Sequence, residues 1–367
     1  VYGRRMKPLR FAVPALLAMA GIVLALILAE AGFRVFAWAR GMLAGDLATQ
    51  LARSATRPLE SGDRFSMSGL VRSSPHGDVV YELKPGTRGI FQRQPLHINS
   101  RGLRDREYSL RKPPGTFRLV GLGDSVMFGW GVREDESYLA VLERRLNSLP
   151  PPHRRFEVLN FAVPGYNTAI EVAVLRRKAI AFRPDAVVIH FVNNDFAVPL
   201  FLQRADTSSL GRSYVLDFLR SRFGTAPRDD SLVGVDLRDV PGEDRSRVLG
   251  RYQYMVGESG FRRAMDRLAR IAGRHGIPVI VILGSAYGRQ GEIVRDVTTR
   301  HGFELVEIKP YTTAWLREHG VPDEVRAKSA ALTQLPVDGH PNARAHEIFA
   351  TALLDRLTRM GVVRAAP

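Results

Sequence analysis

The strongest constraint on the fold is an alternation of two patterns over residues 117–360. Short apolar segments of strand length alternate with longer segments whose apolar residues recur at helical spacing. Strands that are apolar along their whole length are typical of a parallel sheet covered by helices on both faces, so the sequence predicts an α/β fold. The expected strands are Phe117–Leu122, Phe156–Ala162, Ala186–Val192, Ile277–Leu283 and Phe303–Ile308. The expected helices are Glu134–Leu146, Thr168–Phe182, Phe261–Arg274, Gly291–Arg300 and Asn342–Met360.

An apolar segment near the amino end, Phe11–Ala29, contains 19 residues and no charge. This is about the length that a helix needs to cross a hydrocarbon layer of ~30 Å. Basic residues are denser before the segment than after it, which favours a cytoplasmic amino terminus. A cleaved signal peptide is the alternative, because Ala29-Glu30-Ala31 resembles a cleavage site. We expect an uncleaved single-pass anchor, with the remainder of the chain outside the cytoplasm.

Composition and turn signals divide the chain into consecutive parts. Turn residues between short β-like pieces predict a small β-rich lead-in before the main domain. Within the main domain, a long segment with a helix-like stretch over Tyr214–Phe223 interrupts the alternation, and we expect it to be a lid or substrate-selecting cap. The expected parts are a basic cytoplasmic tail (1–10), the transmembrane anchor (11–29), a juxtamembrane stalk (30–77), the lead-in (78–116) and the main domain (117–365) with its lid (196–258).

The chain is strongly basic, with a formal net charge of +16 at pH 7. Arginine carries the excess, since only six of the 53 basic residues are lysine. A basic surface favours nucleic acid, anionic lipid or an acidic polymer as partner. The sequence has no nucleic-acid-binding motif and its basic residues are scattered, so we expect mostly solvated charge, with an anionic membrane or acidic glycan as second choice. The chain has no cysteine, which excludes disulfides and cysteine-bound metals.

The turn after the first expected strand carries Gly123-Asp124-Ser125. A strand, a tight turn and a helix place Ser125 at the carboxyl edge of the sheet, where open α/β sheets bind ligands. A serine at such a turn can also be a simple helix N-cap. A chemical role is favoured because the rest of the chain supplies further polar residues at strand ends, in a fixed order.

Five residues at these positions form a candidate catalytic set. Acyl transfer needs a nucleophile, a base, a group that orients the base and donors for the oxyanion. A serine hydroxyl is a weak nucleophile at neutral pH, so Ser125 needs His340 to accept its proton, and Asp338 is placed to hold the second nitrogen of that ring. The expected oxyanion donors are the backbone N–H groups of Ser125 and Gly165 and the side-chain amide of Asn194.

These stretches resemble the sequence blocks of the SGNH/GDSL hydrolases. Gly123-Asp124-Ser125 matches the first block, Gly165 the second, Asn194-Asp195 the third, and Asp338 with His340 the fifth. The upstream segment Ile98–Asp105 resembles the lead-in of membrane-anchored bacterial members. The resemblance covers about residues 117–360 and implies a flavodoxin-like three-layer α/β/α fold, no metal or other cofactor, and esterase, lipase or carbohydrate O-acyl chemistry. For an anchored chain it implies a catalytic domain on the periplasmic face of the bacterial inner membrane.

Two features depart from the family pattern. Val192 stands where the third block usually begins with glycine, which would narrow the approach to the oxyanion site. Only Gly339 separates Asp338 from His340, where the family usually has two residues. Either Asp338 orients His340 through a reshaped turn, or a Ser–His pair acts without it. The chain has no Gly-x-Ser-x-Gly elbow, which disfavours the α/β-hydrolase family.

Further residues near the blocks are candidates for contact with substrate. The aspartates among them are also typical turn formers at strand ends, and core packing explains the aromatic side chains equally well. Histidines outside the fifth block are expected in the core or at helix ends, so no metal site is predicted. The candidates are Asp124, Phe128, Trp130, Tyr166 and Asp195.

The expected function is a serine esterase that hydrolyses O-acyl esters through an acyl-enzyme. Transfer of the acyl group to a sugar hydroxyl instead of water would make the protein an O-acetyltransferase for an envelope or exported polysaccharide. The departures at Val192 and Asp338 leave a third alternative, a catalytically degenerate glycan-binding or scaffold protein. The expected anchor and the basic surface suggest an acylated glycan or lipid of the cell envelope as substrate.

Overall fold

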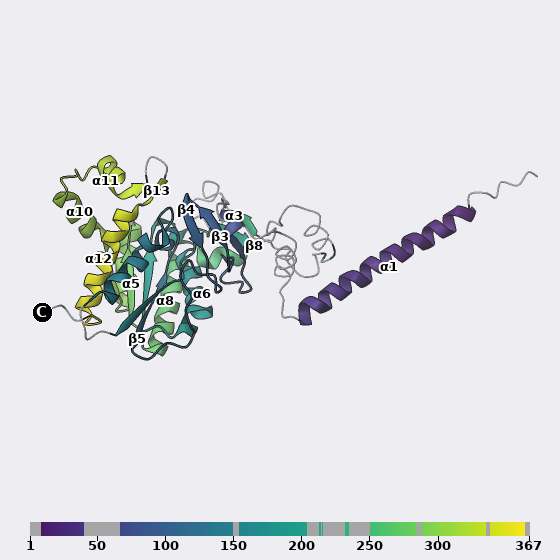
Figure 1. The fold of residues 1–367 in the computed structure, drawn as a ribbon, viewed down its shortest axis with the longest axis horizontal. Coiled ribbons are helices and arrows are strands. Elements are labelled where there is room, and N and C mark those ends of the chain that lie inside the picture. The colour runs from purple at the N-terminus through teal and green to yellow at the C-terminus, as the bar shows by residue number, and fades with distance from the viewer. Residues whose placement is uncertain are drawn as a thin grey trace, which may run out of the picture. The chain divides into compact units, whose positions relative to one another are not determined.

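A five-stranded parallel sheet forms the centre of the computed structural model (Figure 1). The strand order is β11-β10-β7-β5-β6, and every neighbouring pair is parallel. In chain order this is the 2-1-3-4-5 arrangement of flavodoxin-like doubly wound folds. The predicted α/β class is confirmed. The strands are β5 (Thr116–Leu122), β6 (Arg155–Asn160), β7 (Ala186–Phe191), β10 (Val279–Leu283) and β11 (Glu304–Glu307).

The structure describes residues 9–39, 67–149, 154–203, 213, 215, 232–234, 250–284, 288–334 and 338–363. It divides into two units, one of residues 1–58 with 203–231 and one of residues 59–202 with 232–367. Residues 40–66 of the expected stalk and most of the expected lid, including nearly all of the helix expected over Tyr214–Phe223, lie outside the described residues. Residues 30–39 of the expected stalk are helical, and residues 67–77 belong to the second unit. The sheet and the candidate site belong to the second unit.

Helices cover both faces of the sheet. The chain moves from β5 to β6 in one direction and from β6 to β7 in the other, so right-handed crossovers put α5 and α6 on opposite faces. α12 packs against α5, and α8 packs against α6, which gives three layers. The covering helices are α5 (Tyr138–Asn147), α6 (Thr168–Arg177), α8 (Gly257–His275), α9 (Gly288–Arg300), α10 (Ile308–Glu318) and α12 (Ala343–Arg359).

Local chemistry explains where these helices begin and end. Asn167 caps α6 and Asn342 caps α12, each by accepting a backbone N–H with its side-chain oxygen. Gly276 ends α8 in the left-handed region, which a residue with a Cβ adopts at a cost. The helix expected over Glu134–Leu146 is interrupted at Ser137, whose backbone is extended, so that a 3₁₀ turn η1 (Glu134–Glu136) precedes α5.

Other boundaries also differ from the sequence prediction. The helix expected over Thr168–Phe182 breaks at Lys178 and continues as the 3₁₀ turn η2 (Ala179–Phe182). Ile308 begins α10 and does not end a strand. The sequence pattern predicted neither α10 nor the elements that follow it, because these segments are short and their apolar residues are only weakly periodic. The elements after α10 are α11 (Val325–Leu332) and the two-stranded hairpin of β12 (Thr333–Gln334) and β13 (Asp338–Pro341).

Short antiparallel strands precede the sheet along the chain. β1 pairs with β2 and β3 pairs with β4; the last three of these strands lie in the expected β-rich lead-in, whereas β1 lies in the last residues of the expected stalk. Tyr81 and Ile98 of this region are fully buried and belong to the main hydrophobic core. The remaining short elements of this unit are α3 (Met67–Leu70), β1 (Val71–Ser73), β2 (Tyr81–Leu83), β3 (Arg88–Phe91), β4 (Gln94–His97), α4 (Ser125–Phe128), η3 (Asn193–Phe196), β8 (Phe201–Gln203), β9 (Leu232–Gly234) and η5 (Gly250–Met255).

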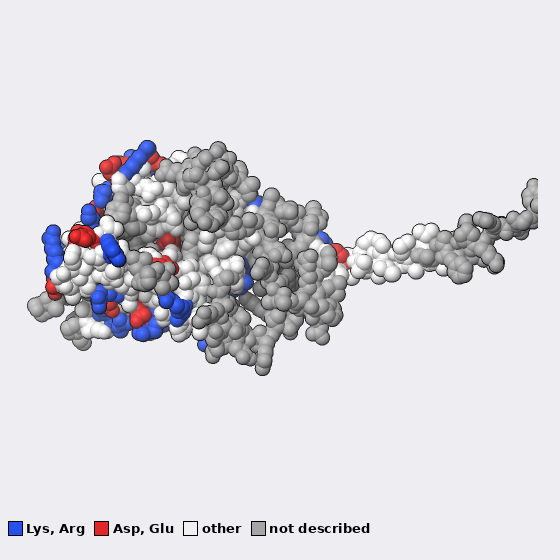
Figure 2. All heavy atoms as spheres, turned by 90° about the horizontal axis from the view of Figure 1, so that it is seen from above, with Lys and Arg blue, Asp and Glu red and all other residues white. Residues whose placement is uncertain are grey.

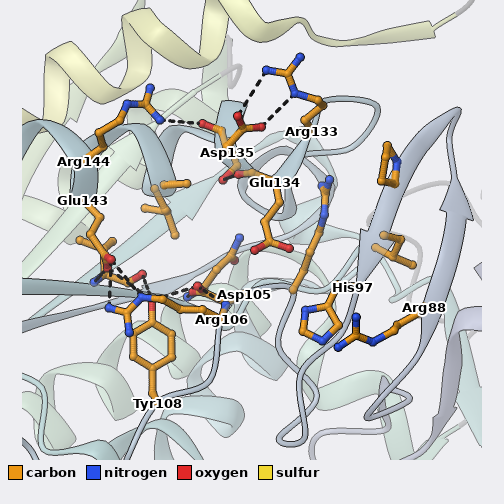
Figure 3. A pocket seen from close by; sticks show the side chains of 18 of the residues that line it. Arg88, His97, Asp105, Arg106, Tyr108, Arg133, Glu134, Asp135, Glu143 and Arg144 are labelled. Atoms are coloured by element: carbon orange, nitrogen blue, oxygen red, sulfur yellow. Dashed lines mark hydrogen bonds and ion pairs between the residues drawn. The ribbon is translucent and has the colours of Figure 1, made fainter.

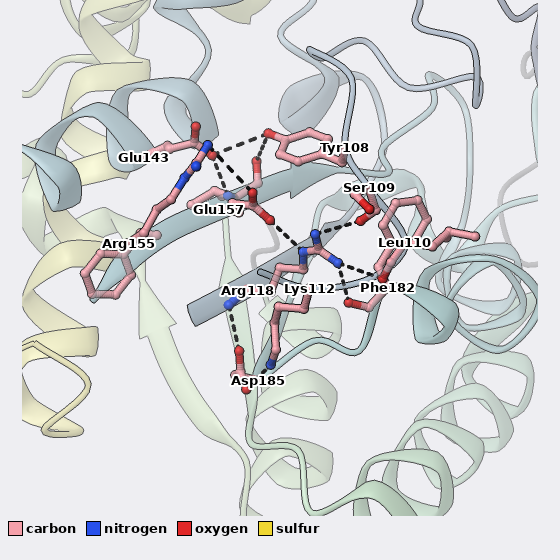
Figure 4. Close-up of polar contacts among 12 residues, drawn as sticks. Tyr108, Ser109, Leu110, Lys112, Arg118, Glu143, Arg155, Glu157, Phe182 and Asp185 are labelled. Carbon is pink, nitrogen blue, oxygen red and sulfur yellow. Dashed lines mark hydrogen bonds and ion pairs between the residues drawn. The ribbon is translucent and has the colours of Figure 1, made fainter. Parts of the chain in front are cut away.

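One buried arginine ties the lead-in to the sheet (Figure 4). Arg118 of β5 is 0% exposed, and its Nε donates to Glu157 Oε2 on β6 at 2.7 Å. The other guanidinium nitrogens donate to backbone carbonyls of Ser109, Leu110 and Phe182 at 2.7–3.2 Å. A buried charge is tolerable only when it is paired and hydrogen-bonded, as this one is.

The described residues of the first unit include one long helix, α1 (Leu9–Ala39). Residues Leu16–Val35 of α1 form a span of 20 residues that is long and apolar enough to cross a membrane. Within this unit, Glu30 accepts hydrogen bonds from the Ser213 hydroxyl and the Val215 backbone N–H. The same length and composition suit a membrane anchor and a signal sequence.

Replacing Arg118 with methionine should lower the free energy of unfolding by about 3–5 kcal/mol, because Glu157 is left buried without its partner. Guanidinium denaturation of the R118M variant measures this loss. R155M is the matched control. Arg155 is exposed and its contact with the same carboxylate is long, at 3.9 Å, so its loss should lower the free energy of unfolding by less than about 1 kcal/mol. The double variant R118M/E157L should be more stable than R118M alone, and a double variant as unstable as the sum of its parts would contradict this account.

Candidate active site

The Gly123-Asp124-Ser125 turn lies directly after β5, at the carboxyl edge of the sheet. Asp124 caps the short helix α4 by accepting the Val126 N–H at 2.9 Å. Gly123 is required by space, since a Cβ there would lie 2.7 Å from the Met127 Cβ. Ser125 is thereby the first residue of α4, and its N–H is one that the helix itself leaves without a partner.

Ser125, His340 and Asp338 lie in contact. His340 Nε2 is 2.8 Å from Ser125 Oγ, and His340 Nδ1 is 2.5 Å from Asp338 Oδ1. The same carboxylate oxygen also accepts the His340 backbone N–H at 2.9 Å. With only Gly339 between them, Asp338 and His340 can therefore still form this contact, since the Asp338 side chain turns toward both the backbone and the ring of His340.

Trp130 completes this arrangement from the other side. Its Nε1–H donates to Asp338 Oδ2 at 2.7 Å, so each carboxylate oxygen has its own donor. The indole also stacks on the His340 ring, with centroids 5.0 Å apart and planes inclined by 18°. Gln334 holds the tryptophan in turn by donating to its carbonyl at 2.6 Å. The sequence suggests Trp130 as a substrate contact; in the structure its indole contacts Asp338 and His340 instead.

Hydrogen bonding sets the charge state of Asp338. Burial by itself would raise the pKa of this carboxyl, but the hydrogen bonds from His340 and Trp130 outweigh burial and lower the pKa below its usual value. Asp338 is therefore ionised at neutral pH and accepts from both neighbours. No other acceptor in the described residues contacts His340 Nδ1.

The expected oxyanion donors come from two other strand ends. Gly165 follows β6 with φ +79°, and a Cβ there would lie 2.3 Å from Leu200 Cβ. Within the described residues the Gly165 N–H has no acceptor in the protein. Asn194, in the turn after β7, donates its side-chain amide to Asp124 Oδ2 at 3.3 Å. This contact brings Asn194 next to the residue that precedes Ser125.

Asp124 also contacts the serine hydroxyl, with 3.1 Å between Ser125 Oγ and Asp124 Oδ2. A hydroxyl has one proton, so Ser125 donates either to Asp124 or to His340 Nε2. Burial raises the pKa of Asp124, although hydrogen bonds from Val126 and Ser125 oppose the rise.

Asp195 and Glu171 lie buried beneath this edge of the sheet. Asp195 accepts the Val192 N–H at 2.7 Å and the Thr168 hydroxyl at 2.5 Å, which fixes the turn that carries Asn194. Burial raises the pKa of Asp195 to about 8, with a contribution from the charge of Asp124. Burial and the nearby Asp195 raise the pKa of Glu171 well above its usual value, and both its carboxylate oxygens lack a partner in the described residues.

Four of the five residues that the sequence suggests for substrate contact are buried. Phe128 and Tyr166 are at most 1% exposed, and the Tyr166 hydroxyl donates to the Tyr81 carbonyl. The carboxylate of Asp195 is buried and used by its own turn. Asp124 is likewise 2% exposed and serves as a cap, so these side chains hold the site in shape and do not line it.

A cavity of about 740 Å³ opens beside the histidine, and sequence analysis missed most of its walls. His340 and Asp338 line one side, and Val126 and Val192 lie at the strand ends. Val192, which replaces a glycine of the family pattern, therefore faces this cavity. The opposite wall comes from α10 and α11, which the hydrophobic pattern did not predict: Ile308, Lys309, Thr312, Val325, Lys328, Ser329 and Leu332.

A larger cavity of about 950 Å³ lies between the β3–β4 hairpin and α5 (Figure 3). It contains none of the residues Ser125, Asp338 and His340. Arg106 points to Glu143 and donates to it at 3.0–3.2 Å, beside Tyr108. Burial raises the pKa of Asp105 at its floor to about 7, although hydrogen bonds from Asn160 and Tyr108 oppose the rise. Within the described part of the chain, no cluster of three or more possible metal ligands is found there or elsewhere.

The fold and the site together define a hydrolase of the SGNH type. A model of the GDSL-like lipase/acylhydrolase family matches residues 122–348, more than half of the 367 residues. The chain belongs to this family. Its predicted membership and its place among hydrolases that act on esters are thereby confirmed. No curated protein matches the chain.

Solved structures resemble the chain at low identity. LAE5, an α/β hydrolase enzyme from the metagenome of Lake Arreo, Spain, is 17% identical, with 68% of this chain and 97% of that chain covered and a TM-score of 0.42. TesA is 17% identical, with 66% and 99% covered and a TM-score of 0.40. Axe2, an acetylxylan esterase from Geobacillus stearothermophilus, is 15% identical, with 66% and 94% covered and a TM-score of 0.42. Likeness at this level does not identify a substrate.

The buried acids predict how stability depends on pH. A carboxyl whose pKa is raised in the folded state keeps its proton while the unfolded chain loses its own, so stability falls as pH rises above the unfolded pKa. In the E171Q variant, the free energy of unfolding should decline less steeply between about pH 5 and pH 7. The difference in slope should be up to about 1.4 kcal/mol per pH unit, the value for one proton. Urea denaturation across this range tests the prediction. E318Q, at an exposed position on α10, should follow the unaltered protein, and parallel curves for E171Q would refute the assignment.

Proposed function

We propose that this protein is a serine esterase in which Ser125 is the nucleophile, His340 the general base and Asp338 the group that orients the base. The single observation that carries the proposal is the continuous chain of contacts from Asp338 through both ring nitrogens of His340 to Ser125 Oγ. A nucleophile in hydrogen-bond reach of a base, with the base oriented by a third group, is the signature of covalent acyl transfer.

In the first half of the reaction the Ser125 hydroxyl turns from Asp124 to His340. As Oγ bonds to the ester carbonyl carbon, its proton passes to His340 Nε2 and the carbonyl electron pair moves onto oxygen. The N–H groups of Ser125 and Gly165 and the amide of Asn194 stabilise that oxyanion. The carbon–oxygen bond to the alcohol then breaks, and His340 returns the proton to the departing alkoxide.

In the second half, water replaces the alcohol. His340 takes a proton from water as its oxygen attacks the acyl-enzyme, and the proton then passes to Ser125 Oγ as the acid leaves. Asp338 stabilises the imidazolium in both halves without accepting its proton. The Asn194 amide nitrogen has two N–H groups, so one can donate to Asp124 while the other donates to the oxyanion.

The proposed setting is the outer face of a membrane. α1 has the length and composition of a single-pass anchor, and the basic residues before it favour an amino terminus in the cytoplasm. The catalytic domain would then lie in the periplasm, beside acylated glycans and lipids of the envelope. We propose one of these as substrate. A noncatalytic scaffold is disfavoured, because it would not require a hydroxyl, an imidazole and a carboxylate in line.

The test of the nucleophile uses the detergent-solubilised full chain and p-nitrophenyl acetate. The S125A variant should lose at least about a thousandfold in kcat, and only the unaltered serine should be labelled by a fluorophosphonate. S148A removes an exposed hydroxyl on the neighbouring helix and should leave the rate unchanged. Equal rates for S125A and the unaltered protein would refute the proposal, and faster acyl transfer to an added glycan than to water would identify a transferase.

Trp130 should act as a positioning residue. The W130F variant keeps an aromatic ring against His340 but removes the donor to Asp338 Oδ2, so kcat should fall about tenfold or more with little change in KM. Loss of this donor should raise the pKa of Asp338, which moves the acid limit of activity to higher pH. W315F, in a tryptophan that stacks on His319 away from the site, is the control. An unchanged kcat and pH profile in W130F would show that the hydrogen bond has no part in orienting the base.

A further inference from the structure

Four arginines form a straight stripe on α8. Arg263, Arg267, Arg270 and Arg274 follow one another at intervals of four, three and four residues. At 100° per residue these positions fall within about 60° of arc, and they extend over about 16 Å of the helix. We refer to them as the arginine stripe. No acidic residue of α8 lies within this arc; Asp266, at its border, pairs with His301 of α9.

The arginine stripe is poor in counter-charges. In the described part of the chain, Arg267, Arg270 and Arg274 have no carboxylate within ion-pair distance. Arg263 donates only to the Tyr254 carbonyl, at 2.7 Å. By contrast, Arg262 on the flank of the same helix pairs with both Glu258 and Asp296. Like Arg262, the lysines and arginines on the face drawn in Figure 2 lie among acidic side chains.

The stripe borders a cavity of about 450 Å³ that is almost entirely cationic. Its lining is Arg176 of α6, Ile271, and the three stripe residues Arg267, Arg270 and Arg274. Arg176 is the one member with an ion pair, to Asp78. Guanidinium groups bind phosphate oxygens through paired N–H donors, so this cavity has the chemistry of a phosphate site.

The cavity lies at the edge of the sheet opposite the candidate active site. α8 ends at His275, shortly before β10 begins at Val279, so Arg270 and Arg274 lie near the amino edge of the sheet. Ser125 follows β5 and lies at the carboxyl edge. One strand length, about 20 Å, separates the two edges. The cavity at the carboxyl-terminal end of α8 is therefore a separate site from Ser125.

We propose that the arginine stripe is a docking surface for the anionic phosphate headgroups of a lipid bilayer. Within the described residues the stripe is an extended row of arginines without a carboxylate partner, which matches a plane of phosphates, and α1 supplies a span of membrane length in the same chain. Docking of the whole stripe lays α8 along the bilayer surface, so the carboxyl edge with Ser125 and His340 opens beside the bilayer. An acidic polysaccharide is the competing occupant, and its binding is a distinct outcome of the test.

The absence of cysteine allows the surface to be labelled at a single site. Gly273 is exposed, and a Cβ there meets no atom within 4 Å, so G273C accepts a fluorophore beside the stripe. The full-length chain would be reconstituted in nanodiscs that contain an acceptor dye on lipid headgroups. Energy transfer should be high with phosphatidylglycerol, low with phosphatidylcholine alone, and should fall as salt is added.

Charge reversal tests the stripe itself. R270E/R274E should reduce occupancy of the docked state at least about tenfold, as judged from energy transfer. R317E/R326E, a matched reversal of two exposed arginines on α10 and α11, should retain it. Equal transfer with neutral and anionic lipid, or an equal loss in both double variants, would overturn the proposal. So would loss of binding to soluble polygalacturonate in R270E/R274E without any change in nanodiscs, which would assign the stripe to a polymer. The readout needs no turnover, so it is independent of the proposed esterase activity.

Discussion

The contact between Ser125 Oγ and His340 Nε2 joins positions 215 residues apart, and the geometry of the candidate site depends on it. Both side chains come from short segments at the carboxyl edge of the sheet, one after β5 and the other in β13. Parallel strands direct all their carboxyl ends to one edge, which is why separate loops can meet there. The order 2-1-3-4-5 then sets β5 between β6, which leads to Gly165, and β7, which leads to Asn194.

Two kinds of polar interaction support this contact. At the site, Asp338 is held by His340 on one oxygen and by Trp130 on the other, and these donors stabilise its charge. In the core, Arg118 fastens β5 to the lead-in and to β6. The same strand therefore carries both the buried ion pair and the turn with Ser125. Rigid support of this kind is what a catalytic hydrogen bond requires.

Basic charge has two different arrangements on this chain. Many arginines, such as Arg262 and Arg295, are paired with carboxylates on adjacent elements, so they add little directional field. Those of the arginine stripe lie on one helix face, and among the described residues they have no carboxylate partner. The first arrangement follows from an abundance of charged residues, whereas the second requires a helix that places every third or fourth residue on one side.

The sequence by itself determined the order and type of the central strands and helices, because hydrophobic periodicity is a local property, and it named Ser125, Asp338 and His340. It could not find α10, α11 or the β12–β13 hairpin, whose short and irregular segments gain their structure from packing and not from periodicity. Only the tertiary structure decided that one intervening glycine suffices between Asp338 and His340, and that Trp130 serves the carboxylate. Such contacts depend on where side chains distant in sequence converge, and that is fixed by the close packing of the whole domain.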